Sequence, residues 1–213
     1  VVIAALGSNS DHNNEIEIWF CDDLSKGKSA FSKTILETSS SIMVAPRVFH
    51  TSSGWRIFSS QSDETSFDLM TATSQNGRTW TAFTSFRGAD SDDFKNPFAP
   101  HLSHNDRQDV VVFQAQHAQN NRYTFQLYAT FSNDRGNTWT RPILISGQDT
   151  ITDNSSFASY HNRNPFVYVT NSEINVAWER TQQASENAHI WTSRITESGV
   201  VFRSAEEVTD RGN

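Results

Sequence analysis

The sequence predicts an all-β fold, and three observations support this prediction. Charged residues make up only 19% of the 213 residues, while Ser, Thr and Asn crowd the connecting segments, as is typical of proteins with many turns. The apolar runs are short and rich in aromatic residues, which favours strands. No stretch has a convincing 3.6-residue apolar period, so we expect no amphipathic helix.

One order of elements recurs along the chain: an apolar strand, a polar linker, a second strand, a turn and a third strand. It occurs four times, in residues 1–36, 55–83, 110–142 and 174–208. A further apolar strand separates the repeats, at residues 42–51, 96–103 and 164–171. The repeat units therefore start near residues 1, 56, 110 and 174 and hold about four strands each.

Four-stranded repeats cannot each bury both faces alone, so they must stack, and a closed radial stack is a β-propeller. The sequence thus predicts a single propeller domain over residues 1–213, or part of one, with about four four-stranded antiparallel blades. The first repeat starts on what resembles the second strand of a blade. We therefore expect further blades or a partner chain to complete the ring, and a closed four-bladed ring is the alternative.

Two turns carry a specific motif. SNDRGNTW at 132–139 matches S-x-D-x-G-x-T-W at every defined position, and SQNGRTW at 74–80 matches it with one deletion and Asn in the Asp position. The motif resembles the Asp-box, or BNR repeat, of the sialidase-like (neuraminidase superfamily) propellers. The strand and turn in NPFVYVTNSEINVAWE also resemble the way in which sialidase-like blades open. The resemblance extends over the whole chain as four repeats, two of them with degenerate turns.

The motif residues are expected to be structural. In a tight hairpin, the Asp134 carboxylate accepts from turn N–H groups that lack ladder partners, and Gly136 takes a positive φ. Trp139 is expected to begin the outgoing strand and to pack between blades. The resemblance implies that the Asp-box lies on the outer rim, away from the active site. The structural set is Ser132, Asp134, Gly136, Trp139, Ser74, Asn76, Gly77 and Trp80.

Function is expected where the strands between repeats line a central tunnel and the loops that enter them form a funnel. The expected substrate contacts are Asn96, His101, Asn164 and Trp178. The sialidase resemblance implies three arginines that clamp a substrate carboxylate, a tyrosine nucleophile beside a glutamate, and an aspartic acid that protonates the leaving group. The candidates for the clamp and the nucleophile pair are Arg47, Arg163, Arg180, Glu179 and Tyr160, with Asp63 and Asp93 as candidate acids.

Several candidates also have a structural interpretation. Asn96 and Asn164 each precede a proline, so turn chemistry at the start of a strand explains them. Glu179 and Arg180 are successive residues of one predicted strand and would point to opposite faces, so one ligand would not meet both.

Composition excludes several classes of protein. A net charge of −7 without a Lys/Arg cluster argues against a nucleic-acid partner, and no apolar run reaches the ~18 residues of a membrane span. With Cys21 as the single cysteine and seven scattered histidines, we expect no disulfide and no metal site. The carboxylates of residues 90–93 would suit calcium but lack a glycine-punctuated loop. No cofactor motif is present, and we expect none to be bound.

Two functions remain. The first is a sialidase-like propeller that recognises, and if catalytic hydrolyses, terminal acidic sugars of glycans as an exo-glycosidase, in an extracellular, periplasmic or cell-surface setting. The alternative is a non-catalytic propeller that serves as a scaffold for protein partners. Three arginines that converge with a Tyr/Glu pair in one funnel would favour the first.

Overall fold

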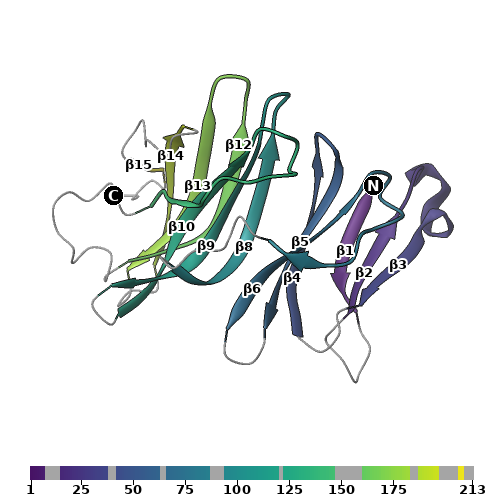
Figure 1. The fold of residues 1–213 in the computed structure, drawn as a ribbon, viewed down its shortest axis with the longest axis horizontal. Helices are drawn as coiled ribbons and strands as arrows, with labels where there is room; N and C mark the ends of the chain where they lie inside the picture. Colours follow the sequence, from purple (N-terminus) through teal and green to yellow (C-terminus); the bar gives the residue numbers. More distant parts are fainter. Residues whose placement is uncertain are drawn as a thin grey trace. The chain divides into compact units, whose positions relative to one another are not determined.

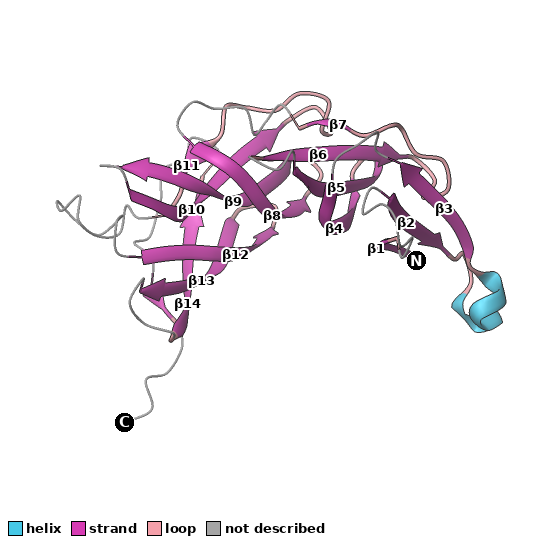
Figure 2. Cartoon of the chain, turned by 90° about the horizontal axis from the view of Figure 1, so that it is seen from below, coloured by secondary structure: helices cyan, strands magenta, loops and turns pink. Residues whose placement is uncertain are grey.

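The computed structural model describes residues 1–7, 15–37, 42–62, 66–86, 94–119, 122–146, 160–182, 187–196 and 206–208. Figure 1 traces the chain, and Figure 2 shows that nearly every described element is a strand. Over these residues, the only helix is the short 3-10 turn η1 (Leu24–Ala30), and no helix is long and apolar enough to cross a membrane. The strands form four antiparallel sheets, which confirms the predicted all-β class and the predicted number of sheets.

The chain divides into two compact units, Val1–Phe86 and Arg87–Asn213. In the first unit, one sheet has three strands, in the order β1 (Val2–Leu6), β2 (Glu15–Phe20) and β3 (Ser32–Glu37). The other sheet has four, in the order β4 (Ile42–Thr51), β5 (Gly54–Ser62), β6 (Phe67–Ser74) and β7 (Thr84–Ser85). Between these two sheets lies an apolar core that contains Ile16, Ile18, Met43, Ile57 and Ala72.

The second unit contains two four-stranded sheets. The first has the order β8 (Phe94–His104), β9 (Asp109–Gln119), β10 (Arg122–Ser132) and β11 (Ile143–Leu144). The second has the order β12 (Tyr160–Val169), β13 (Ile174–Gln182), β14 (Ala188–Ile195) and β15 (Glu206–Glu207). The core between them includes Val110, Val112, Leu127, Val167, Val176 and Trp178. The strands predicted between repeats are thus β4, β8 and β12, each at the edge of its sheet.

Each of these three edge strands contains a β-bulge at an X-Pro step. The residues before the prolines of these strands have positive φ angles: Ala45 (50°), Asn96 (53°), Ala99 (48°) and Asn164 (51°). Proline cannot donate to the ladder, so the pairing is interrupted there. From Arg163 to Phe166 the partner strand advances only from Glu179 to Ala177, and the one-residue mismatch marks the bulge. The Asn-Pro steps therefore lie inside the strands, and not at their starts as expected.

The two motif turns share one pattern of hydrogen bonds. In the second unit, the Asp134 carboxylate accepts from Thr138 N (2.8 Å) and Thr138 Oγ1 (2.6 Å), and Ser132 Oγ accepts from Gly136 N (2.8 Å). The bonds from Thr138, followed by the one from Ser132, lower the pKa of Asp134 to about 2. Trp139 donates from Nε1 to Gly136 O (3.1 Å). Strand β11 begins only at Ile143, so Trp139 precedes the outgoing strand instead of beginning it.

In the first unit, Asn76 takes the place of the aspartate. Its Oδ1 accepts from Arg78 N (2.8 Å) and Thr79 N (2.9 Å), while Ser74 Oγ accepts from Gly77 N (2.8 Å). Gly77 has a φ of 75°, as Gly136 has one of 81°. Trp80 packs against the apolar core of its unit. An amide oxygen thus replaces the carboxylate as the acceptor for the turn N–H groups.

Candidate functional site

Polar side chains gather at one end of the second unit, where β10 and β12 begin and β9 and β13 end. We call this region the polar end, and its members are Gln114, Thr124, Phe125, Gln126, Tyr160, His161, Asn162, Arg163, Asn164, Glu179, Arg180 and Trp191. Several hydrogen bonds join the sheets here; Asn162 Nδ2 donates to Gln126 Oε1, and Asn164 N donates to Gln114 Oε1, both at 2.8 Å. These bonds fix the residues of the polar end on one sheet relative to those on the other.

A buried network around Gln126 supports the polar end. Gln126 is only 1% exposed, and its Oε1 accepts from Asn162 Nδ2 and from Ser146 Oγ, each at 2.8 Å. Its Nε2 donates to Thr124 Oγ1 (3.0 Å) and to Tyr160 O (3.1 Å). Trp178 Nε1 donates to Asn162 Oδ1 (2.7 Å). Because both ends of the Gln126 amide are satisfied, the network fixes how β12 starts against β10.

Arg180 lies between two aromatic rings. Its Cζ is 4.3 Å from the centroid of the Tyr160 ring and 4.4 Å from that of Trp191, and the residue is 5% exposed. Both are cation-π distances. The structure thus pairs Tyr160 with Arg180, whereas Glu179 Oε2 accepts from Asn164 Nδ2 (2.9 Å). Gln182 lies opposite Tyr160, three positions along β13 from Glu179, so the expected Tyr/Glu pair is separated along the strands by about 10 Å.

The Arg163 guanidinium lies against one aromatic ring, whereas that of Arg180 lies between two. Its Cζ lies 4.9 Å from the Phe125 ring centroid, and Glu179 is its partner in the strand register. Within the described part of the chain, no carboxylate forms an ion pair with Arg163, and its buried Nε has no hydrogen-bond acceptor. A partly buried guanidinium gains from an anion or a carbonyl group, so Arg163 is the strongest ligand-binding candidate at the polar end.

The neighbouring His161 is held neutral. Its Nδ1 accepts from Phe125 N (3.2 Å), and burial, followed by the positive charge of Arg163, lowers the pKa of His161 below its usual value. A proton on this ring would break that bond and bring two cations together. His161 therefore serves as an acceptor that positions the start of β12 beside Phe125.

This arrangement predicts a loss of stability in mild acid. Above about pH 6.5 the imidazole is neutral in the folded and in the unfolded chain, but below it the unfolded chain binds a proton that the folded chain resists. Stability therefore falls as the pH drops from about 6.5 to the lowered pKa. We expect the Tm difference between about pH 7.5 and 5.5 to shrink in His161→Gln, which retains an acceptor. An unchanged difference would show that His161 does not contribute.

The remaining candidates lie in other places. Asn96 Nδ2 donates to Gln116 Oε1 (2.7 Å) beside the bulge of β8. His101 lies further along β8, where its Nδ1 accepts from Val167 N (3.3 Å) and its ring is 4.2 Å from that of Phe166. Trp178 is 3% exposed within the core, while its cross-strand partner Trp191 is the ring that contacts Arg180. Sequence reasoning missed Trp191, although it directly follows the apolar Ile190 in a predicted strand.

Arg47 belongs to the first unit. It lies on β4 opposite Phe58, and burial lowers the pKa of its guanidinium. The described polar end thus contains two of the three predicted arginines, Arg163 and Arg180. The candidate acids Asp63 and Asp93 and the carboxylates of residues 90–93 lie outside the described residues. Among the residues that are described, no three His, Cys, Asp or Glu side chains lie close enough together to hold a metal ion.

The chain is similar in structure to several glycoside hydrolases. A thermostable family-43 glycoside hydrolase matches 100% of this chain and 68% of its own, at 15% identity and a TM-score of 0.61. The α-L-arabinanase of Penicillium chrysogenum, solved with arabinobiose, matches 93% and 60%, at 13% identity and a TM-score of 0.60. The endo-arabinase of Bacteroides thetaiotaomicron matches 98% and 80%, at 14% identity and a TM-score of 0.55.

No protein-family model matches the sequence, and no curated protein matches it either. At identities of 13–15% the structural likeness shows the fold alone, which is a β-propeller. The chain spans 60–80% of the length of these three proteins.

Proposed function

We propose that this chain recognises carbohydrate at its polar end, with a terminal acidic sugar as the ligand. The observation that carries the proposal is Arg163, whose guanidinium lies against Phe125 and has no carboxylate partner among the described residues. The planar guanidinium fork matches the two oxygens of a sugar carboxylate. Glu179, held by Asn164 at 2.9 Å, supplies an acceptor for sugar hydroxyls beside it.

The fold supports a carbohydrate ligand, because the similar structures are glycoside hydrolases and one of them was solved with arabinobiose. Hydrolysis ordinarily needs two carboxyl groups that flank the scissile bond, or a tyrosine nucleophile in the sialidase variant. Of the described residues at the polar end, Glu179 alone is acidic, and the Tyr160 ring is stacked on Arg180. Recognition is therefore the core of the proposal, and a fluorogenic sialoside assay tests for turnover.

We expect N-acetylneuraminic acid to bind the intact protein, and Arg163→Lys to weaken that binding by about 1.5–3 kcal/mol, roughly ten- to a hundredfold. An ammonium group cannot reproduce the guanidinium fork, although it keeps the charge. Calorimetric titration measures the affinity. Arg78→Lys is the matched control, because this exposed arginine of the first unit pairs with Asp22, and its change should leave the affinity intact.

Other outcomes of the same titration separate the alternatives. If arabinobiose binds and N-acetylneuraminic acid does not, and Arg163→Lys has no effect, the ligand is a neutral sugar and the acidic-sugar proposal fails. If neither sugar binds, the scaffold function gains support. One observation favours a scaffold: Phe166 and Tyr168 on β12 are 53% and 58% exposed, and exposed aromatic side chains on one strand often mark contacts with a protein partner.

A further inference from the structure

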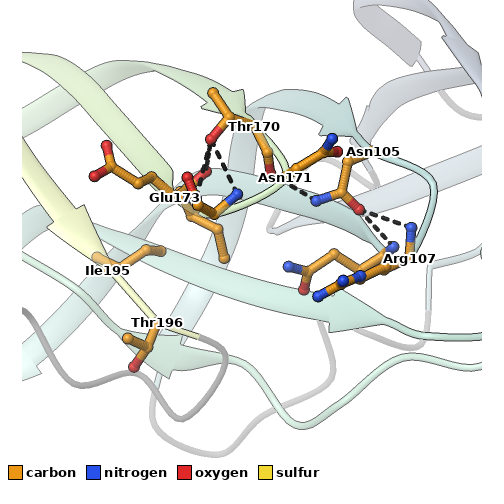
Figure 3. A pocket seen from close by; sticks show the side chains of 10 residues that line it. Asn105, Arg107, Thr170, Asn171, Glu173, Ile195 and Thr196 are labelled. Carbon is orange, nitrogen blue, oxygen red and sulfur yellow. Dashed lines mark hydrogen bonds between the residues drawn. The ribbon is translucent and has the colours of Figure 1, made fainter.

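A pocket of about 420 Å³ opens at the other end of the same two sheets, between the β8–β9 turn and the β12–β13 turn (Figure 3). It is lined by Asn105, Arg107, Gln108, Thr170, Asn171, Ser172, Glu173, Ile174, Ile195 and Thr196. Its volume is within the range of small-ligand sites. Since Arg163 and Thr170 are seven positions apart along the same extended segment, the pocket is about 20 Å from Arg163.

Hydrogen bonds within the turns form the rim of the pocket. Asn105 Oδ1 accepts from Arg107 N (2.8 Å) and Gln108 N (2.9 Å), and Asn105 Nδ2 donates across to Thr170 O (2.7 Å), as Figure 3 shows. Thr170 Oγ1 in turn accepts from Glu173 N (3.0 Å). One side chain thus joins the two turns, and the rim is ordered before any ligand arrives.

Three lining side chains have hydrogen-bonding capacity that the described structure does not use. Gln108 Oε1 is buried and accepts no hydrogen bond from any described residue, which is costly unless a donor reaches it. Arg107 and Asn171 are exposed, and neither side chain has a partner within the described ranges. The floor is apolar, because Ile174 and Ile195 are 4% and 2% exposed. The pocket therefore offers one orphan acceptor, flexible donors and an apolar base.

This combination discriminates between classes of ligand. A fully ionised anion would meet Arg107 but has no hydrogen for Gln108 Oε1, and a cation would meet Gln108 but is repelled by Arg107. The Glu173 carboxylate is already paired with Arg194, so it adds no free negative charge. Sugar hydroxyl groups both donate and accept, and the C–H face of a sugar ring suits an isoleucine floor.

We propose that this pocket is a second carbohydrate-binding site, for a neutral saccharide, independent of the polar end. The half-buried Gln108 side chain turns its Oε1 toward one hydroxyl group, while Arg107 and Asn171 donate to others. The polar end and the pocket lie at opposite ends of the same strands, so a variant at one leaves the other intact.

Heteronuclear NMR of the intact protein, titrated with arabinobiose and with xylotriose, tests the proposal. We expect amide shifts in residues 105–108 and 170–173 with at least one of these sugars. Gln108→Leu should weaken the response about tenfold or more, because it removes the acceptor. Gln75→Leu is the matched control, since Gln75 is an exposed glutamine in a turn of the first unit. An Arg107→Ala variant changes an exposed side chain and should also weaken binding.

Three outcomes would overturn the proposal: no shift in these turns with either sugar at millimolar concentration, equal binding by wild type and both pocket variants, or sodium phosphate displacing the sugar and shifting the same amides more strongly. The result is separable from the proposed function. Arg163→Lys should leave the pocket shifts unchanged. If a sugar binds at the polar end but not in the pocket, the pocket proposal fails, and if it binds in the pocket but not at the polar end, the proposed function fails.

Discussion

Replacing Gln126 with leucine is expected to destabilise the second unit by about 3 kcal/mol or more. Leucine has a similar volume but no polar atoms, so Asn162, Ser146 and the carbonyl group of Tyr160 each lose a buried partner. A buried polar group without a partner costs roughly 1–3 kcal/mol, and relaxation recovers only part of it. Urea unfolding followed by tryptophan fluorescence measures the change, because Trp178 is bonded to Asn162 of the same network.

Gln75→Leu provides the control, since the side chain of Gln75 is exposed and its loss should change stability by less than about 0.5 kcal/mol. If the two variants unfolded at the same urea concentration, the Gln126 network would not be a determinant of stability. A further variant, Gln126→Glu, has two acceptor oxygens in place of one but loses both N–H donors, and it should destabilise at least as much as Gln126→Leu because it also buries a charge.

Replacing Gly54 with alanine is expected to cost about 3 kcal/mol or more in the first unit. Gly54 has a φ of +122°, and a Cβ there would be 2.5 Å from Ser74 O and 2.9 Å from Gln75 Cα. Those are backbone atoms of the paired strand β6 and the turn after it, so they cannot move as a flexible side chain would. The strained φ costs roughly 1–3 kcal/mol, and the overlap adds to it. The free energy of unfolding in urea measures the sum.

Gly27→Ala separates the two contributions. Gly27 also has a positive φ, +69°, but no atom lies within 4 Å of its added Cβ. Gly27→Ala should therefore lower the free energy of unfolding by the cost of the strained φ alone, about 1–2 kcal/mol. A cost for Gly54→Ala no larger than that of Gly27→Ala would mean that β6 yields to the added methyl group.

Much of the fold was predictable because its signals are local. The repeat of strands and turns, and the spacing of Ser132, Asp134 and Gly136, depend on neighbouring residues alone. The all-β architecture and the order of strands within each sheet followed from these patterns. The start of the outgoing strand was misplaced, because Trp139 donates to Gly136 O within the turn, a bond that precedes any ladder pairing.

The site was less predictable because its contacts join distant strands. Gln126 and Asn162 are 36 positions apart, and nothing in the sequence pairs them. Trp178 and Trp191 are directly opposite on β13 and β14 and share one face with Arg180, so which ring contacts Arg180 depends on how the side chains pack there. The separation of Tyr160 from Glu179 depends on the register of β12 against β13. Packing and register between strands determine these contacts, and the pattern of residues along one strand does not predict them.

The X-Pro bulge of β12 has a consequence for how this protein can be altered. The bulge lies between residues 160–163, which belong to the polar end, and residues 166–169, which include the core members Val167 and Val169. Because the extra residue is absorbed there, the alternation of side chains in one half of the strand is not tied to that in the other. Natural drift or laboratory selection can therefore change the half of β12 that belongs to the polar end while the hydrophobic half keeps its register with β13.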